Sequence, residues 1–167
     1  MPHVVFLCTG NAARSVIGGA IALARRDDLT VVTAGTHVVE GMPMSWRTRD
    51  ALGAIGVRAD GHRSHQLRDG DVAVTDIVIA MAGEHVTYMR RQHPEAASRT
   101  ATLKRLVRDL QEGGDARLAE RLAALDLASV EVEPWEDVAD PAGGDLPEFE
   151  ACVAEIDGLL TELLPRL

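Results

Sequence analysis

Aromatic residues are scarce in this chain of 167 residues, which has two tryptophans, one tyrosine and two phenylalanines. Cysteine is scarcer still, since the chain has only Cys8 and Cys152. Two cysteines so far apart exclude a disulfide-stapled scaffold and a cysteine-based zinc module. No apolar run reaches the roughly 18 residues needed to cross a bilayer, and the first residues lack the basic start and long apolar stretch of a secretory signal. We therefore expect a cytoplasmic protein without membrane insertion.

Positive charge is also in short supply. The chain has 17 basic and 26 acidic residues, for a formal net charge of −9. Residues 131–167 contain eleven acidic residues and one basic residue, whereas residues 1–130 are close to neutral. This balance disfavours nucleic-acid binding, which needs a basic surface, but allows a small anion site built from arginine and backbone N–H groups. The length predicts one domain over residues 1–167.

Strands and helices alternate in the pattern of hydrophobic residues. Short apolar runs predict strands at 4–7, 29–33 and 76–81, and the segment 101–110 fits either a strand start or an amphipathic helix. Helical spacing predicts helices at 15–26, 46–55, 84–92, 115–127 and 148–164. Such alternation favours right-handed crossovers, and we expect an α/β fold with a four-stranded parallel sheet in a three-layer α/β/α sandwich. Gly18 and Gly19 lie inside the first helix, where close packing would explain them.

Residues 8–15, Cys-Thr-Gly-Asn-Ala-Ala-Arg-Ser, are the segment with the clearest chemistry. Cys8 ends the first strand, at the edge of a parallel sheet where ligands bind. Five residues separate Cys8 from Arg14, and a loop of this length can turn its N–H groups inward, helped by Gly10 and Asn11, which tolerate positive φ. The following helix N-terminus favours an anion and a thiolate, and Arg14 can bind two phosphate oxygens. The alternative is a buried cysteine beside an arginine in a surface turn.

Asp140, followed by Pro141, is the candidate general acid. Phosphoryl transfer to a thiolate leaves an oxygen that needs a proton, and a carboxylic acid on a loop can supply it and later take a proton from water. Asp-Pro is also a common turn pair, so a solvated turn is the alternative.

At this point the chain resembles the low-molecular-weight protein tyrosine phosphatases, a family that includes bacterial phosphoarginine phosphatases and related arsenate reductases. The resemblance covers nearly the whole chain. Its motifs are the phosphate-binding loop at 8–15, Thr33-Ala34-Gly35-Thr36, the segment 61–67, the strand at 76–81 and the acid loop at 137–144.

The resemblance implies a role for each site residue. Cys8 is the nucleophile that forms a phosphocysteine, Arg14 holds the phosphoryl oxygens and Asp140 is the general acid and base. Asn11 would fix the loop through contacts near Thr33 and His62. The other expected phosphate-binding residues of the loop are Thr9, Gly10, Ala12, Ala13 and Ser15. No metal or other cofactor is needed. The expected partner is a phosphorylated protein, with phosphotyrosine preferred, and the chain is expected to be a monomer or a weak homodimer.

The chain also departs from the family pattern. Ala13 stands where many members have a second cysteine, and Ala142-Gly143 stands where tyrosine-specific members often have aromatic residues. Cys152 is expected to pack in the core. Three alternatives therefore stay open: a phosphatase for another residue such as phosphoarginine, an arsenate reductase coupled to a small thiol, and a phosphate-binding module without activity.

Overall fold

One parallel sheet forms the centre of the fold. The computed structural model describes all 167 residues. Its strands are β1 (His3–Cys8), β2 (Thr30–Gly35), β3 (Ile77–Ala80) and β4 (Thr100–Thr102). They are hydrogen-bonded in the order β2-β1-β3-β4, and every neighbouring pair is parallel. The predicted α/β fold with a four-stranded parallel sheet is confirmed.

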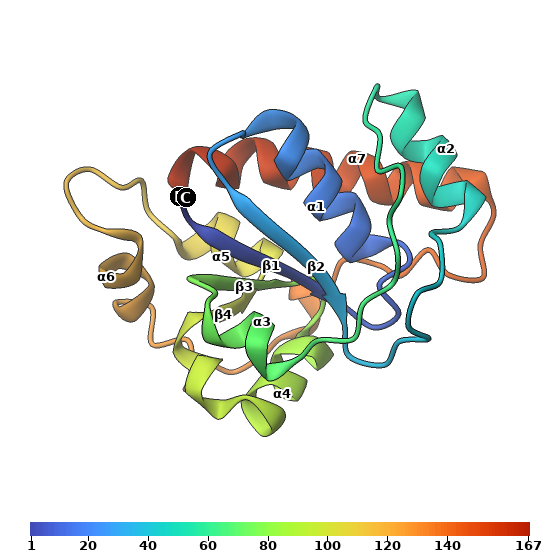
Figure 1. Cartoon of the computed structure of the whole chain (residues 1–167). Coiled ribbons are helices and arrows are strands. Elements are labelled where there is room, and N and C mark those ends of the chain that lie inside the picture. Colours follow the sequence, from blue (N-terminus) through green and yellow to red (C-terminus); the bar gives the residue numbers. More distant parts are fainter.

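Helices cover both faces of this sheet, which gives the expected three layers (Figure 1). The α-helices are α1 (Arg14–Arg25), α2 (Trp46–Ala54), α3 (Asp69–Ala73), α4 (Gly83–Gln92), α5 (Leu103–Asp109), α6 (Leu118–Ala123) and α7 (Leu146–Leu163), with short 3₁₀ turns η1 (Pro94–Arg99), η2 (Pro134–Glu136) and η3 (Leu164–Arg166). Helices α1, α5 and α7 pack on one face, and α3, α4 and η1 pack on the other. The ambiguous segment 101–110 contains both alternatives, since β4 leads directly into α5. No helix of the chain is long and apolar enough to span a membrane.

Side chains of β1 alternate between the two cores. Val4, Phe6 and Cys8 face the larger core beneath α1 and α7, whereas Val5 and Leu7 face the smaller core beneath α4. This period of two is that of an extended strand. It turns Cys8 toward the side of the sheet on which α1 begins.

Both glycines of α1 allow close packing, as predicted. A Cβ atom on Gly18 would lie 2.8 Å from Phe6 Cδ1, and one on Gly19 would lie 2.2 Å from Thr33 Cγ2. Neither approach is possible for a real Cβ atom, so these positions set how closely α1 lies on β1 and β2.

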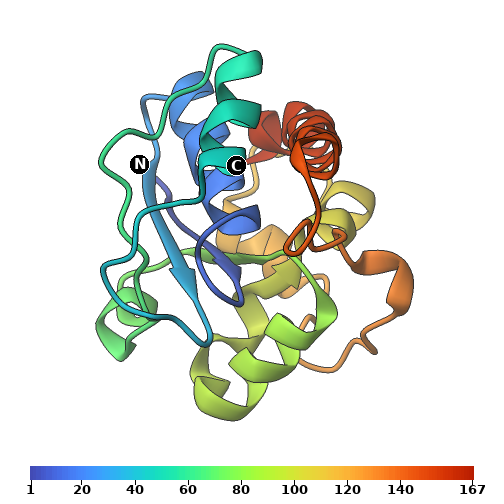
Figure 2. The ribbon, with the colours of Figure 1, turned by 90° about the vertical axis from the view of Figure 1, so that its right-hand side faces the viewer.

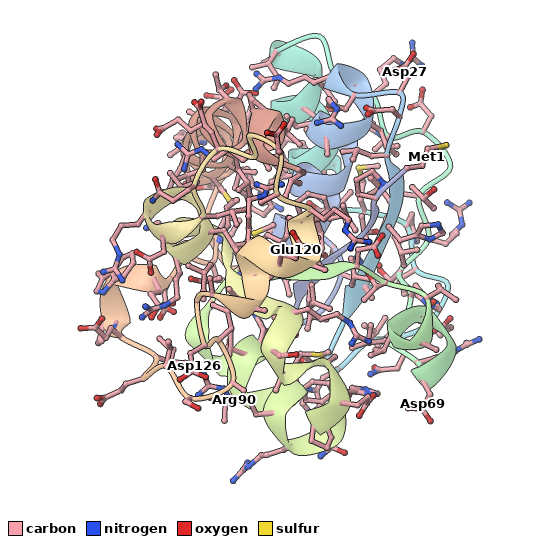
Figure 3. All side chains as sticks on the ribbon, turned by 90° about the vertical axis from the view of Figure 1, so that its left-hand side faces the viewer. Met1, Asp27, Asp69, Arg90, Glu120 and Asp126 are labelled. Carbon is pink, nitrogen blue, oxygen red and sulfur yellow. The ribbon has the colours of Figure 1, made fainter.

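The predicted helix over 115–127 is wrong in its extent. Only Leu118–Ala123 is helical, and Asp126 adopts a φ of +50° that cannot continue a helix. Arg90 then donates hydrogen bonds to the carbonyl oxygens of Leu127 and Val130. Figure 3 shows Glu120, Asp126 and Arg90 together at the end of the molecule that Figure 1 draws on the left. This segment therefore lies away from the Cys8 loop.

The strand order places a crevice at the carboxyl ends of β1 and β3. The chain leaves β1 toward β2 on one side and leaves β3 toward β4 on the other, and ligands bind where connections diverge in this way. Figure 2 faces this edge, where the loop after β1 and the segment before α7 come together. The candidate site lies here.

Candidate active site

The loop Cys8–Ser15 turns sharply between β1 and the start of α1. Its turn is made at Asn11, which adopts a φ of +50° and is fully buried. Asparagine tolerates this left-handed conformation better than most residues, as the sequence suggested. Gly10 is exposed at the top of the loop, and Ala12 and Ala13 are half-buried.

Asn11 is bound on all sides. Its Nδ2 donates to Ser15 Oγ (2.8 Å), and its Oδ1 accepts from the backbone N–H of His65 (2.9 Å). Its carbonyl oxygen lies 2.9 Å from His62 Nε2 and 3.0 Å from Ser64 Oγ, which both donate to it. Because a carbonyl oxygen can only accept, His62 carries its proton on Nε2, and burial is the main cause that lowers the pKa of its ring. These bonds fix the loop geometry before any ligand binds.

Thr33, expected beside Asn11, lies elsewhere. It precedes the end of β2 by two residues and pairs in register with Phe6, so its methyl group meets Gly19 of α1. None of the hydrogen bonds of Asn11 comes from Thr33, and Ser64 and His65 make contacts that the sequence did not assign. The expected contact between His62 and Asn11 is present.

Thr48 is a further support that sequence reasoning missed. This fully buried residue of α2 donates from Oγ1 to the carbonyl oxygen of Ala12 (2.9 Å). Ser45 caps the helix by accepting from the N–H of Thr48 (3.2 Å), which fixes that turn. No local pattern around Thr48 could reveal a contact with a residue 36 positions away.

Gly35 allows the end of β2 to approach the loop. A Cβ atom there would lie 2.4 Å from the carbonyl oxygen of Thr9 and 3.0 Å from the backbone nitrogen of Asn11. The next two residues hold the loop from the same side, because Thr36 N–H donates to Cys8 and His37 N–H donates to Thr9.

The Cys8 thiol lies at the base of the loop and is 3% exposed. Its Sγ is 2.9 Å from Ser15 Oγ. Since Ser15 Oγ already accepts from Asn11 Nδ2, its own proton is free to donate to sulfur. A chain of hydrogen bonds from Asn11 through Ser15 thus directs a hydroxyl donor at the Cys8 sulfur.

Arg14 joins this loop to the acid loop. The guanidinium is nearly buried and donates from Nη1 to the carbonyl oxygen of Val138 (3.0 Å) and from Nη2 to Asp140 Oδ2 (3.1 Å). Asp140 itself is 49% exposed, and its other oxygen accepts from the N–H of Ala142 (3.0 Å). The three residues expected to carry the chemistry therefore lie on two loops that Arg14 joins at the carboxyl end of the sheet: Cys8 and Arg14 on one, and Asp140 on the other.

The base of the acid loop is anchored on the sheet. Val138 N–H donates to the carbonyl oxygen of Met81 (2.8 Å), and Asp137 Oδ1 accepts from the N–H of Gly83 (2.8 Å). Just before them, the buried Glu136 carboxylate accepts from Arg105 and from Thr102 Oγ1 (2.7 Å). Hydrogen bonds from Arg105 and Thr102 offset the effect of burial, and the pKa of Glu136 is lowered.

A cleft of about 330 Å³ opens beside the loop. Its lining residues are Ala12, Ala13, Ser45, Arg47, Ala142, Gly143, Gly144, Asp145 and Phe149. Phe149 is buried, so no exposed ring lines the cleft. Trp46 is half-exposed and packs under the Arg47 guanidinium, and Trp135 packs against Arg105 and Arg108. The cleft beside the Cys8 loop therefore has no exposed aromatic side chain, in line with the small number of aromatic residues in the sequence.

His85 and Cys152 are two further groups near the site. His85 Nε2 lies 2.9 Å from Thr9 Oγ1. Burial, and then the charge of Arg14, lower the pKa of His85 to about 3. Cys152 on α7 is buried, and burial raises its pKa to about 12, so its thiol stays protonated. Nowhere in the chain are three or more histidine, cysteine, aspartate or glutamate side chains grouped to hold a metal ion.

Comparison with known proteins agrees with this geometry. The family model described as "Low molecular weight phosphotyrosine protein phosphatase" matches residues 3–120. The Protein-arginine-phosphatase of Geobacillus stearothermophilus is 29% identical over 169 residues, which cover 100% of this chain and 97% of that protein. The Low molecular weight protein-tyrosine-phosphatase of Streptomyces coelicolor is 29% identical over 171 residues, with 97% and 91% covered. The solved structure of the low molecular weight protein tyrosine phosphatase from T. tengcongensis matches with a TM-score of 0.80 at 28% identity, and 100% of each chain is covered.

Proposed function

The chain belongs to the low molecular weight phosphotyrosine protein phosphatase family and is a cysteine-based protein phosphatase, and we propose that Cys8, Arg14 and Asp140 carry out its reaction. The observation that supports this most directly is the Arg14 guanidinium, which lies in the same loop as the Cys8 thiol and contacts the Asp140 carboxylate. This contact supports the proposal that the nucleophile, the oxyanion-binding group and the acid act together.

In the first proposed step the Cys8 thiolate attacks the phosphorus atom. The P–S bond forms while the bond from phosphorus to the leaving atom breaks, and Asp140 gives its proton to that atom. The N–H groups of residues 9–15 and the Arg14 guanidinium stabilise the charge that develops on the phosphoryl oxygens. The Ser15 hydroxyl, 2.9 Å from the sulfur, stabilises the thiolate before attack and after release.

In the second proposed step water hydrolyses the phosphocysteine. Asp140 takes a proton from the water molecule, the new P–O bond forms and the P–S bond breaks. Phosphate leaves and the Cys8 thiolate is restored. The bonds from Asn11 to Ser15, His62, Ser64 and His65 keep the loop in one geometry through both steps.

Phosphotyrosine is the proposed principal substrate. Cys8 is 3% exposed at the base of the loop, so the phosphorylated side chain must be long enough to reach it. Phosphotyrosine carries its phosphate farther from the backbone than phosphoserine or phosphothreonine does, so it meets this condition best.

Phosphoarginine is the second candidate, and the cleft favours it specifically. It is equally long, and alanines and glycines line the cleft without an exposed ring to stack on tyrosine. The Asp145 carboxylate is 87% exposed and lies 3.4 Å from Arg47. It can therefore also bind the guanidinium of a phosphoarginine substrate. One full-length relative is named as a protein-arginine-phosphatase, and another is named as a low molecular weight protein-tyrosine-phosphatase. An arsenate reductase that relays a disulfide finds no support, because Cys152 is buried and protonated.

Two substitutions test the proposed roles. Cys8→Ser should abolish hydrolysis of an aryl phosphate, whereas Cys152→Ala, a change at the other cysteine, should leave it intact. Asp140→Asn should slow hydrolysis without unfolding the protein, with Asp115→Asn, at an exposed residue outside the cleft, as the control. An unchanged rate in Asp140→Asn would show that the assigned acid is wrong. Equal rates on phosphotyrosine, phosphoarginine and phosphoserine would contradict the length argument.

The remaining proposals concern context. We propose that residues 1–167 act as a single phosphatase domain in the cytoplasm, where a reducing environment keeps both free thiols reduced. We also propose that the protein is a monomer or a weak homodimer, which sedimentation at several concentrations would test.

A further inference from the structure

His85 lies behind the first residue of the phosphate-binding loop, in a position that the reaction above does not use. It belongs to the first turn of α4, which packs on the opposite face of the sheet from α1. Its ring is 1% exposed, and Nε2 lies 2.9 Å from the hydroxyl of Thr9. The other ring nitrogen, Nδ1, is buried and has no hydrogen-bond partner.

The surroundings of Thr9 define which nitrogen of His85 carries the proton. The Thr9 hydroxyl lies 3.4 Å from Glu84 Oε1 and can donate only one proton. If that proton goes to the Glu84 carboxylate, His85 must donate from Nε2, and Nδ1 keeps only a lone pair. The opposite tautomer would bury an unpaired N–H at Nδ1 and would also leave Glu84 without this donor. The first arrangement satisfies more groups, because a buried donor without a partner is costly.

We infer that His85 is a positioning residue, which fixes Thr9 and the start of the phosphate-binding loop through a hydrogen bond from Nε2–H to Thr9 Oγ1. Thr9 is held at a second point, because its carbonyl oxygen accepts from the N–H of His37 (3.0 Å). With hydroxyl and carbonyl both fixed, the peptide between Thr9 and Gly10 has one orientation. The inference rests on the proposed function of this loop.

A neutral ring suits this position electrostatically. The positive charge of Arg14 disfavours a second positive charge at His85, whereas the negative charge of Asp140 favours one. A charged imidazole would therefore compete with Arg14 for the Asp140 carboxylate. The buried neutral ring supplies a hydrogen bond to Thr9 without changing the charge of the site.

A double-mutant cycle tests the contact. His85→Leu and Thr9→Val each remove one partner while keeping a side chain of similar size. Each should lower kcat/KM for an aryl phosphate by about tenfold, since one net hydrogen bond corresponds to roughly that factor. The double variant should lose about tenfold as well, because both changes remove the same interaction. His85→Gln, whose amide reaches about as far as Nε2, should recover most of the rate.

Two results would overturn the inference: a double variant whose loss is the product of the single losses, or a His85→Leu variant with the full kcat/KM. His93→Gln is the matched control, because His93 is also buried and follows the last residue of the same helix. It should leave kcat/KM unchanged, and a loss equal to that of His85→Leu would assign the effect to helix α4 as a whole. Failure of the proposed function is separate, since Cys8→Ser would then retain turnover whatever the cycle shows.

Discussion

Lowering the pH from 7 to 5 should destabilise the folded protein by about 2 kcal/mol through His85 alone. The pKa of this side chain is 6.5 in the unfolded chain and about 3 in the folded protein. Between these values the unfolded chain binds a proton that the folded protein does not. The free energy of unfolding therefore falls as the pH drops below 6.5, by about 1.4 kcal/mol for each full pH unit.

The size of this effect follows from the unfolded state. At pH 5 the folded ring is still neutral, so a folded pKa of 3 or 4 gives nearly the same result. Burial is the main cause, because the ring is 1% exposed, and the positive charge of Arg14 adds to it. Asp140 acts in the opposite direction but does not outweigh them.

Urea unfolding at pH 7 and pH 5 measures the effect. The wild-type protein should lose about 2 kcal/mol more over this range than His85→Gln, which has no titrating ring at that position. The pKa of His62 is also lowered by burial, but its contribution is common to both proteins and cancels in the difference. Equal pH dependence in wild type and His85→Gln would refute the argument that His85 is buried and neutral.

Three further predictions concern Gly35 beside the phosphate-binding loop, Glu136 at the base of the acid loop, and the reactivity of the two cysteines. Gly35→Ala should lower kcat/KM for an aryl phosphate by roughly a hundredfold, because its Cβ atom would lie 2.4 Å from the Thr9 carbonyl oxygen and displace the phosphate-binding loop. Circular dichroism should show that the fold is retained, and full activity would contradict the close approach. Glu136→Gln should lower the free energy of unfolding by about 3 kcal/mol in urea, because the buried Arg105 guanidinium loses its shortest and only fully buried charge contact and keeps only the longer contacts to Asp109 (3.4 Å) and Glu133 (3.5 Å). A loss as small as that of an exposed ion pair would count against this. Iodoacetamide at pH 8 should modify Cys8 and not Cys152, because burial raises the pKa of Cys152 to about 12. Phosphate should protect Cys8 from this modification, and mass spectrometry of the peptides distinguishes the two thiols.

Much of the loop could be predicted because its determinants are local. The positive φ of Asn11 follows from the tolerance of asparagine for that conformation, and the strand before Cys8 and the helix after it are visible in the pattern of apolar residues. The close packing of Gly18 and Gly19 was predictable for the same reason, since glycine inside a helix needs an explanation. Its place in an Asp-Pro pair made Asp140 a candidate, and the family resemblance then favoured it over the neighbouring acids. Its contact with Arg14 joins residues 126 positions apart, which no local pattern reveals.

The errors have physical causes of their own. The threonine at position 33 has the right chemistry to support Asn11, but the alternation of side chains along β2 directs it to α1, and Ser64 and His65 hold Asn11 instead. The predicted helix over 115–127 has the right spacing of leucine and alanine. Only Leu122 and Leu127 of its leucines become fully buried, so tertiary packing supports a single short helix there. His85 could not be assigned, because nothing near it in the sequence indicates that Thr9 lies against it.

Because Asp140 contacts Arg14, a side chain of the enzyme itself competes with the substrate for the Arg14 guanidinium. A carboxylate resembles two oxygens of a phosphoryl group, and here it occupies part of the guanidinium that the substrate also needs. Affinity is thereby reduced for every dianion, including the phosphate product, which must leave before the next cycle. Neutralising this carboxylate should tighten phosphate binding even as it slows the chemistry, so the side chain proposed as the proton donor is also expected to help phosphate leave.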